Sequence, residues 1–476
     1  MKSLYIRNFY LSLFFIFFAF LSNSCTKTST STASSVVVPT VVTTATIINV
    51  TATSAQSGGV ISSNGGAIIA ANGVCYSATN ATPTTADSKT TDAIVSSGIQ
   101  YPPFTSQLTT LTPNTLYYLR AYATNSAGTG YGSVIKFTTS ASLTAITTTV
   151  STFAGNGTAG YVDAGGTGAQ FNNPTGVTVD ASGNLYVSDS HNSIIREITS
   201  AGLVSTFAGT PTIGYSDGPV ATAQFYAPTG SAFDSKGNLY VADFGNNVIR
   251  KITPSGTVST YAGNGRAGYY NGAADSSHLK STTDTMALFN NPQAVAVDAA
   301  GNVYVADRGN NLIRKILPTG RVITMAGTLT AGYVDATNVL ASFNNPTGVA
   351  VDASGNVYVA DQGNSAIRKI TPADVVSTIA GGTLQRTLLN FPSGITIDKT
   401  GNLYIVDESG RVFEYTTANV LYNLAGTINA AGFVNSTGTA ALFSNPQGIA
   451  IDGNNNIYVA DQYNNCIRKI VVTLVN

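Results

Sequence analysis

Residues 171–209, FNNPTGVTVDASGNLYVSDSHNSIIREITSAGLVSTFAG, decide the fold of this chain, because similar versions of the stretch occur six times. The proline at its fourth position recurs at intervals of 54, 64, 54, 46 and 54 residues, as Pro174, Pro228, Pro292, Pro346, Pro392 and Pro446. Repeats of this length that contain short β patterns and turns are typical of arrays of equivalent units. The sequence therefore predicts an array rather than one irregular core.

Each copy can be divided into four short strands. In the first copy these are residues 176–180, 185–189, 194–198 and 204–208. The second strand follows one pattern in every copy, read as GNLYVSD, GNLYVAD, GNVYVAD, GNVYVAD, GNLYIVD and NNIYVAD. This pattern resembles the NHL repeat, six copies of which form a β-propeller, and the resemblance spans residues 148–476. It implies an all-β fold with six blades.

The register of the fourth strand predicts how the ring closes. In four copies this strand begins eight residues after a recurring arginine, as Val204 follows Arg196. In the last copy the arginine is Arg468, and the sequence stops eight residues later, while a spare fourth strand at residues 150–155 precedes the first copy. We expect both segments to complete one blade, which removes open sheet edges.

The first residues predict a lipoprotein signal peptide at residues 1–24. Two basic residues precede an apolar stretch at residues 9–21, which is short for a membrane span. The following Ser-Asn-Ser-Cys25 resembles the lipobox of bacterial lipoproteins, and the resemblance implies lipidation at Cys25, with an ordinary secretory signal as the alternative. Acyl chains would anchor the protein firmly. We expect it in the cell envelope, on the outer membrane, with its facing side left open.

Two regions separate this signal from the array. Residues 25–37 are rich in Ser and Thr and predict a flexible tether. Residues 38–141 contain short alternating runs between Gly, Asn and Ser turns, which is typical of a small β-sandwich. The motif from Leu111 to Tyr117, LTPNTLY, resembles the corner of fibronectin type III domains, in which a tyrosine hydroxyl bonds back to the backbone. The resemblance implies a domain that is more often a spacer than a ligand binder.

Composition excludes several classes of function. With 23 basic and 23 acidic residues the chain has no basic excess for nucleic acid. Besides Cys25 there are only Cys75 and Cys466, in different predicted domains, so we expect no disulfide. No metal-ligand spacing or nucleophile motif is present, and we expect no catalytic residue, no metal, no cofactor and a monomeric chain.

An aspartate ends the second strand of every copy, as Asp189, Asp243, Asp307, Asp361, Asp407 and Asp461. Seven residues later stand Arg196, Arg250, Arg314, Arg368, Glu414 and Arg468. Because residues present in every blade belong to its framework, we expect ion pairs between packed sheets, and an irregular fifth unit. The turns at residues 180–184 and their equivalents, and the Gly-Tyr-x-Asp segments, are expected to be structural rather than calcium sites.

The two positions after each aspartate differ between copies, as Ser190-His191, Phe244-Gly245, Arg308-Gly309, Gln362-Gly363, Glu408-Ser409 and Gln462-Tyr463. Variation on a fixed framework is typical of a binding surface and also of a tolerant loop. The connection after Gly263 has 29 residues to the next proline, against 19 in three others, and contains Tyr269, Tyr270, His278 and Lys280. The binding hypothesis takes the side chains Ser190, His191, Phe244, Arg308, Gln362, Glu408, Gln462, Tyr463, Tyr269 and Tyr270.

The sequence thus predicts a membrane-anchored, extracytoplasmic binding protein with protein, peptide or glycan partners. A lactonase- or lyase-like enzyme on the same scaffold is the alternative, and it would hold a metal with carboxylates or histidines at the mouth of the ring. The six inner-strand segments that begin at the repeat prolines contain no carboxylate, His or Lys for such a mouth. A structural protein of the cell envelope is the third possibility.

Overall fold

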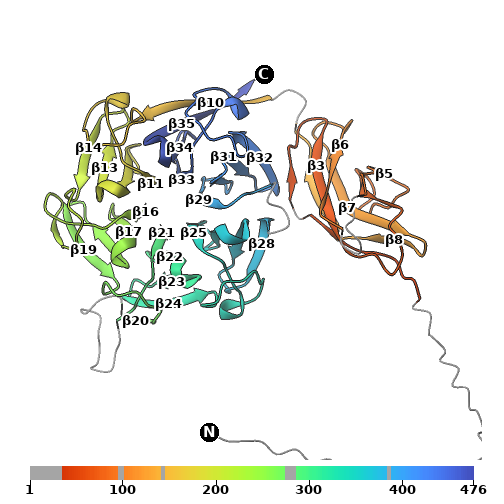
Figure 1. Ribbon diagram of the computed structural model, residues 1–476, viewed down its shortest axis with the longest axis horizontal. Helices are drawn as coiled ribbons and strands as arrows, with labels where there is room; N and C mark the ends of the chain where they lie inside the picture. The colour runs from red at the N-terminus through yellow and green to blue at the C-terminus, as the bar shows by residue number, and fades with distance from the viewer. Residues whose placement is uncertain are drawn as a thin grey trace, which may run out of the picture.

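A computed structural model describes residues 35–44, 46–94, 101–140, 145–273, 286–382 and 388–475. These residues form two β units, a sandwich and a six-bladed propeller, which lie side by side (Figure 1). In the described part of the chain, no helix is long and apolar enough to cross a membrane. The predicted signal peptide with Cys25, and the tether up to residue 34, lie outside the described residues.

The sandwich consists of two sheets. The first contains β1 (Thr40–Thr43), β2 (Ile47–Ile48), β3 (Ala55–Ser63) and β6 (Phe104–Leu108). The second contains β4 (Ala71–Ser77), β5 (Ser88–Lys89), β7 (Leu116–Asn125), β8 (Gly128–Tyr131) and β9 (Ile135–Thr138). Leu108, Leu119 and Phe137 are among the residues buried in its core. The amide of Thr112 donates a hydrogen bond to the hydroxyl of Tyr117 at 3.0 Å, which is the corner contact that the motif predicts.

The propeller is a ring of six antiparallel sheets. Blade 1 contains β11 (Pro174–Val179), β12 (Leu185–Asp189), β13 (Ile194–Ile198) and β14 (Val204–Ala208). Blade 2 contains β16 (Pro228–Phe233), β17 (Leu239–Asp243), β18 (Val248–Ile252) and β19 (Thr257–Ala262). Blade 3 contains β21 (Pro292–Val297), β22 (Val303–Asp307), β23 (Leu312–Ile316) and β24 (Arg321–Ala326).

The second half of the ring follows the same plan. Blade 4 contains β25 (Pro346–Val351), β26 (Val357–Asp361), β27 (Ala366–Ile370) and β28 (Val376–Gly381). Blade 5 contains β29 (Pro392–Ile397), β30 (Leu403–Asp407), β31 (Arg411–Tyr415) and β32 (Val420–Ala425). Blade 6 contains β33 (Pro446–Ile451), β34 (Ile457–Asp461), β35 (Cys466–Val475) and β10 (Ala145–Ala154).

The two ends of the propeller meet in blade 6, as the register of the repeats predicts. Strand β10 pairs antiparallel with β35, from Ala145 opposite Val475 to Ala154 opposite Ile467. The first strand of the propeller thus supplies the outer strand of its last blade. Inner strands of consecutive blades are in contact all around the ring, so the ring is closed.

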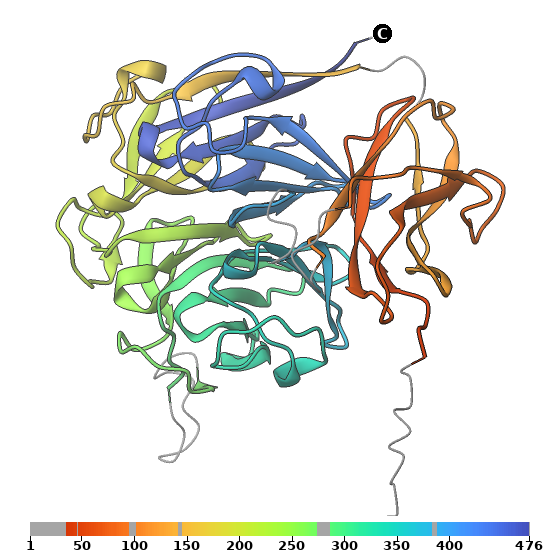
Figure 2. The same cartoon turned by 45° about the vertical axis from the view of Figure 1, so that its right-hand side comes forward.

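Each blade must also cover the exposed edge of its outer strand. In blades 2 and 3 the connection that enters the blade does so, because β15 (Gly218–Pro219) pairs with β19 and β20 (Gly272–Ala273) pairs with β24. Blade 5 differs, since β2 of the sandwich pairs in parallel with β32, Ile47 opposite Val420. Figures 1 and 2 both show the sandwich against this blade. One sheet therefore continues from the sandwich into the propeller.

Candidate functional site

The recurring arginines are clamps within single blades. Arg196 lies fully buried on β13, and its Nη1 is 3.0 Å from Oδ2 of Asp189, at the end of the neighbouring strand β12. Its Nη2 contacts Asp163 and the carbonyl of Val162, both in the connection that enters the blade. The expectation of pairs between packed sheets is therefore wrong. Each arginine joins two strands of one sheet to the entering connection.

The Gly-Tyr-x-Asp segments supply the other half of these clamps. Asp163, Asp217 and Asp335 each bind the arginine of their blade, and Asn271 and Asn435 take this position in blades 3 and 6. A buried phenylalanine lies against each arginine, at 4.9–5.2 Å from the ring centre, as Phe171, Phe225, Phe289, Phe343 and Phe443. The prediction that these segments are structural is confirmed.

Burial sets the electrostatics of the strand-end aspartates. Burial raises the pKa of Asp189 and of Asp307 to about 6. The arginine, the asparagine side chain and the backbone amide that donate to each carboxylate act in the opposite direction and lower it. Each carboxylate is also paired with the arginine of its blade, at 3.0 Å for Asp189 and 2.9 Å for Asp307. All of their donors come from their own blade, so they serve the framework.

Blade 5 is irregular, but in a different way from the one expected. Its turn after Asp407 is shorter, so that the register places Phe413 opposite Ile405, where blade 1 has Arg196 opposite Val187. Glu414 therefore does not replace the arginine. It lies opposite Tyr404, whose hydroxyl donates to it at 3.2 Å, and burial raises the pKa of Glu414.

Arg411, at the start of β31, neutralises the aspartate of blade 5 instead. Its Nη2 lies 2.7 Å from Oδ2 of Asp407, and its guanidinium lies 4.8 Å from the centre of the Phe413 ring. This pair too belongs to the framework of its blade.

The hairpin turns on the opposite end of the blades are Asx turns, as predicted. Oδ1 of Asp180 accepts the amides of Ser182 and Asn184 at 2.8 Å, and its Oδ2 accepts the Asn184 side chain at 3.1 Å. Among the described residues, no group of three or more His, Cys, Asp or Glu could hold a metal ion.

The inner strands line a central channel, and we call the end at which their prolines lie the mouth. In four blades the residue after the proline donates its hydroxyl to the proline carbonyl of the next blade. These bonds run from Thr175 to Pro228 (3.3 Å), Thr229 to Pro292 (3.5 Å), Thr347 to Pro392 (3.1 Å) and Ser393 to Pro446 (2.7 Å). They join neighbouring blades around the channel.

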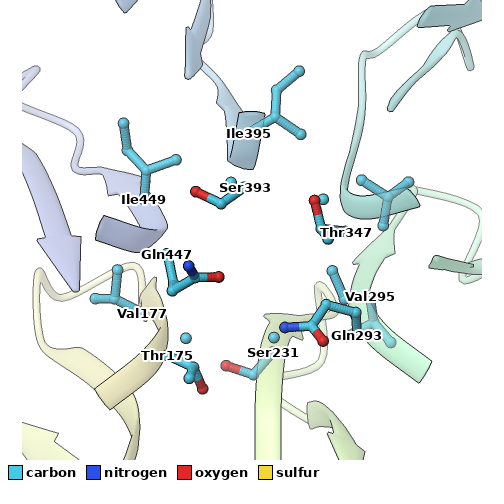
Figure 3. A pocket seen from close by; sticks show the side chains of 17 residues that line it. Thr175, Val177, Ser231, Gln293, Val295, Thr347, Ser393, Ile395, Gln447 and Ile449 are labelled. Carbon is cyan, nitrogen blue, oxygen red and sulfur yellow. The ribbon is translucent and has the colours of Figure 1, made fainter. Parts of the chain in front are cut away.

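Blades 3 and 6, which face each other across the ring, have glutamine at this position. Figure 3 shows the amides of Gln293 and Gln447 directed into the opening from opposite sides. Both residues line a cavity of about 70 Å³ within the channel. Behind them lies a largely apolar ring in which Ser231 is the polar member, beside Val177, Val295, Val349, Ile395 and Ile449. The mouth therefore carries two amides where the repeat favours hydroxyls.

A polar network extends from Gln447 over three blades, and we call it the mouth cluster. Its members are Gln362 of blade 4, Glu408 of blade 5, and Asn445, Gln447 and Gln462 of blade 6. Oε1 of Glu408 accepts from Nε2 of Gln362 at 2.7 Å and from Nε2 of Gln447 at 3.3 Å. Gln447 also donates to Asn445 at 3.2 Å, and Asn445 donates to Gln462 at 2.6 Å. Three residues of the binding hypothesis thus meet here.

The structure separates the remaining loop residues of the hypothesis. Ser190 is buried and donates its hydroxyl to the carbonyl of Pro228, so it joins blades 1 and 2. His191 is exposed, with Nδ1 2.8 Å from Nδ2 of Asn173. Tyr463 is 63% exposed on blade 6. The last two residues of this group are half-buried on short helical turns, Phe244 on η3 (Phe244–Asn246) and Arg308 on η5 (Arg308–Asn310).

Tyr269 and Tyr270 lie apart from the mouth, on the outer part of blade 3. Their ring centres are 5.2 Å apart, and both side chains are exposed. They line a groove of about 400 Å³ with Leu329 and Val339, which belong to the connection between blades 3 and 4. His278 and Lys280 of the same long connection lie outside the described residues. The hypothesis therefore divides into a mouth site and an outer groove.

Sequence reasoning missed the two residues that project farthest into the mouth. The search of the inner strands was for carboxylates, histidines and lysines, and it passed over Gln293 and Gln447. A signal was present, because glutamine follows the proline in two copies that are three repeats apart, while the other four copies have Thr or Ser. Glu408 brings a carboxylate to the mouth from a loop rather than from an inner strand.

Comparisons with known proteins agree with this geometry. The family model described as NHL repeat matches residues 171–196, 289–316, 343–370 and 443–470, which run from just before the first strand into the third strand of blades 1, 3, 4 and 6. NHL repeat-containing protein 2 from Bos taurus is 28% identical over 340 residues, which cover 62% of this chain and 46% of that protein. Human Teneurin-4 is 30% identical over 231 residues, covering 43% of this chain and 8% of its own length.

Two further proteins are similar to this chain in sequence or in fold. Protein SUPPRESSOR OF QUENCHING 1 from Arabidopsis thaliana is 29% identical over 278 residues, covering 45% of this chain and 26% of that protein. The chain thus spans less than half the length of these relatives. A crystal structure of a protein of unknown function from Bacteroides thetaiotaomicron shares the fold, with a TM-score of 0.52, 17% identity, and coverage of 91% of this chain and 98% of that one. The C-terminal unit of this protein is therefore a six-bladed β-propeller in which blades 1, 3, 4 and 6 match the NHL repeat.

Proposed function

We propose that this protein is an extracytoplasmic binding protein whose ligand docks at the mouth of the propeller channel. An NHL-repeat propeller is in general a platform for interactions, and the mouth is one place where this ring departs from its own symmetry. The observation that carries the proposal is the pair of opposed glutamines. Gln293 and Gln447 forgo the hydroxyl bond that joins four pairs of blades and present amides to the opening instead.

The chemistry of the mouth defines the class of ligand. A glutamine amide both donates and accepts hydrogen bonds, whereas a carboxylate such as Glu408 accepts them. Groups that offer several hydroxyls or amides, such as a sugar of a glycan or the backbone of a peptide, match this combination. The channel behind the mouth is narrow, so the ligand inserts a protruding tip rather than a whole chain.

The same proposal covers the location of the protein. Lipidation at Cys25 would anchor the chain in the cell envelope, and the tether and sandwich would hold the propeller away from the membrane. The lipobox resemblance supports this part. Changing Cys25 to Ser should move the protein from the membrane fraction to the soluble fraction on cell fractionation. Retention of this variant in the membrane fraction would contradict anchoring through a lipid on Cys25.

The binding proposal is tested with glycan and peptide arrays and a variant that the repeat itself suggests. Gln293→Thr with Gln447→Thr installs the hydroxyl of the other blades, so the ring keeps its fold while both amides are lost. Because each hydrogen bond to an uncharged group contributes about 0.5–1.5 kcal/mol, we expect about tenfold weaker binding of any ligand that the arrays identify.

Tyr463→Ala is the matched control, since this side chain is exposed on the same face but outside the mouth cluster. It should bind with unchanged affinity. Equal binding by the double threonine variant and the parent chain would show that the mouth is not the site. Loss of binding in the Tyr463 variant alone would place the binding site around Tyr463, outside the mouth cluster.

A further inference from the structure

The sandwich has a cavity at one end of its core that plays no part in the propeller. Its volume is about 250 Å³, and its walls come from β3, β4, β6, the residues that follow β5 and the chain that leads into β6. Its lining includes the apolar or aromatic residues Ile61, Tyr101 and Phe104 and the polar residues Asn72 and Asp92. The cavity is therefore amphipathic and opens to solvent, with Ile61 and Asn72 as its buried lining residues.

Three strand positions that face this end of the core are polar. Ser57, Asn72 and Ser106 are 5%, 2% and 0% exposed. Side chains alternate along a strand, and Asn72 and Ser106 lie on the same faces as the core residues Val74 and Leu108. Ser57 and Ser106 are opposite each other in the pairing of β3 with β6. The polar positions thus form one group rather than scattered exceptions.

Some polar atoms of this group have no hydrogen-bond partner. Oδ2 of Asp92 accepts from the hydroxyls of Ser106 and Thr90, but Oδ1 of Asn72 is buried without a partner, as is Oγ of Ser57. Buried polar atoms normally have partners, since leaving one unpaired costs free energy. The orphaned Asn72 oxygen belongs to a residue of the cavity wall.

The charge of Asp92 is also uncompensated. Among the described residues no cation forms an ion pair with it, and residues 95–100, VSSGIQ, contain no Lys or Arg. Asp92 is half-buried, and this burial raises the pKa of its carboxyl group, while the hydrogen bonds from Ser106 and Thr90 lower it. The cavity is therefore lined by hydrogen-bond acceptors, by a carboxyl group without a cationic partner among the described residues, and by two aromatic rings.

We propose that this cavity binds an organic cation of the kind carried by lysine and arginine side chains. An ammonium or guanidinium group has only donors, which match the carboxylate of Asp92 and the free oxygen of Asn72. Aromatic rings such as those of Tyr101 and Phe104 attract cations, and they also accommodate the aliphatic stem of such a side chain. The sandwich then recognises a basic peptide segment, independently of the ligand at the propeller mouth.

Calorimetric titration of residues 26–476, a chain that keeps every described residue, tests the proposal with matched probes. Nα-acetyl-lysine amide and Nα-acetyl-arginine amide are compared with Nα-acetyl-norleucine amide, which has a similar shape but no charge. We expect both basic probes to bind and the neutral probe to bind at least about tenfold more weakly, which corresponds to about 1.4 kcal/mol. Equal binding of the neutral probe would overturn the proposal.

Two variants locate the site. Asp92→Asn removes the charge, and Asn72→Leu removes the orphaned oxygen while completing an apolar core, so it should keep or raise the melting temperature. Each should weaken the lysine probe at least about tenfold. Ser57→Ala, which changes a buried hydroxyl outside the cavity wall, should bind as the parent does. If Asp92→Asn fails to fold, Asn72→Leu decides the question.

Other outcomes would also contradict the proposal. Unchanged binding by Asn72→Leu would place the cation elsewhere. Calcium chloride that displaces the lysine probe and binds more tightly would identify an inorganic cation site. No heat with either basic probe at tens of millimolar would mean that the cavity holds only water.

Discussion

Blade 2 and blade 5 protect the edge of the outer strand in different ways. Blade 2 is entered by a connection of 19 residues from Gly209 to Pro228, and this connection supplies both β15 for the edge and Asp217 for the arginine clamp. Blade 5 is entered by only 11 residues, from Gly381 to Pro392. There β2 of the sandwich covers the edge, and the clamp is replaced by the local pair of Arg411 and Asp407.

The difference shows that the sandwich supplies the strand that covers the outer edge of blade 5. Val420 of β32 is part of the hydrophobic core of the sandwich, and Ile48 of β2 packs against the core between blades 4 and 5. The hydroxyl of Thr46 also donates to the carbonyl of Ile379 in blade 4 at 3.3 Å. An open strand edge invites association with other chains, so the blade with the shortest connection has gained a partner from the other unit.

The largest loss of stability should come from removing the arginine clamp of a blade such as blade 2. In Arg250→Ala, Asp243 stays fully buried without the guanidinium that lies 2.8 Å away, and the connection loses its bond to Asp217. Breaking a buried ion pair by removing one partner costs about 3–5 kcal/mol, so the free energy of unfolding should fall by that amount in urea titrations.

Arg321→Ala is the control for this clamp, because this arginine is exposed at the start of β24. It should change the free energy of unfolding by about 0.5 kcal/mol or less. Similar losses in the two variants would mean that the clamp does not stabilise the blade. The comparison with blade 5 would then rest on the strand edge alone.

The second prediction concerns the edge of blade 5. Ile47 and Val420 are opposite each other across the two units, and each is 1% exposed. Truncating either to alanine should cost about 1–4 kcal/mol, with the Val420 change at the lower end. Because the side chains share one core, a double-mutant cycle should give a coupling energy of about 0.5–3 kcal/mol.

The matched control pairs Ile47→Ala with Val258→Ala. Val258 is 1% exposed on the outer strand of blade 2, where its partner across the edge is Gly218 of the entering connection. These two changes should be additive within about 0.5 kcal/mol. Additivity of the Ile47 and Val420 changes as well would contradict a shared core between the sandwich and blade 5.

The sequence predicts the features that the blades share, because these features follow from the repeat. The closure of blade 6 could be counted from the spacing between Arg468 and its expected strand, and the β10–β35 pairing confirms it. The seven-residue spacing between the strand-end aspartate and the arginine does not hold in blade 5. A shorter turn after Asp407 moved every later position, so that Phe413 rather than Glu414 occupies the arginine's place.

Two other features could not be read from the repeat. Strand β2 has only two residues and pairs with a strand more than 370 positions away, so it has no local signature of its own. At the channel mouth, the repeat shows that Gln293 and Gln447 differ from the other copies, but it does not show that Thr and Ser at the same position bond to the next blade. Both features depend on contacts between distant segments, which spacing does not encode.

The smallest effect should come from the exposed half of the blade 2 clamp. Asp217 is 49% exposed and lies 2.7 Å from Arg250, and blades 3 and 6 use Asn271 and Asn435 at this position, at 2.9 and 2.8 Å from their arginines. Asp217→Asn keeps an oxygen for Arg250 but gives up the acceptor for the amide of Thr260. Since exposed ion pairs contribute about 0–1 kcal/mol, the free energy of unfolding should fall by no more than about 1 kcal/mol. The loss should shrink further in high salt, which screens the charge. A loss comparable to that of Arg250→Ala would mean that the connection, rather than the buried Asp243, is the part of the clamp that stabilises blade 2, and that the covered edge and the clamp act as one unit.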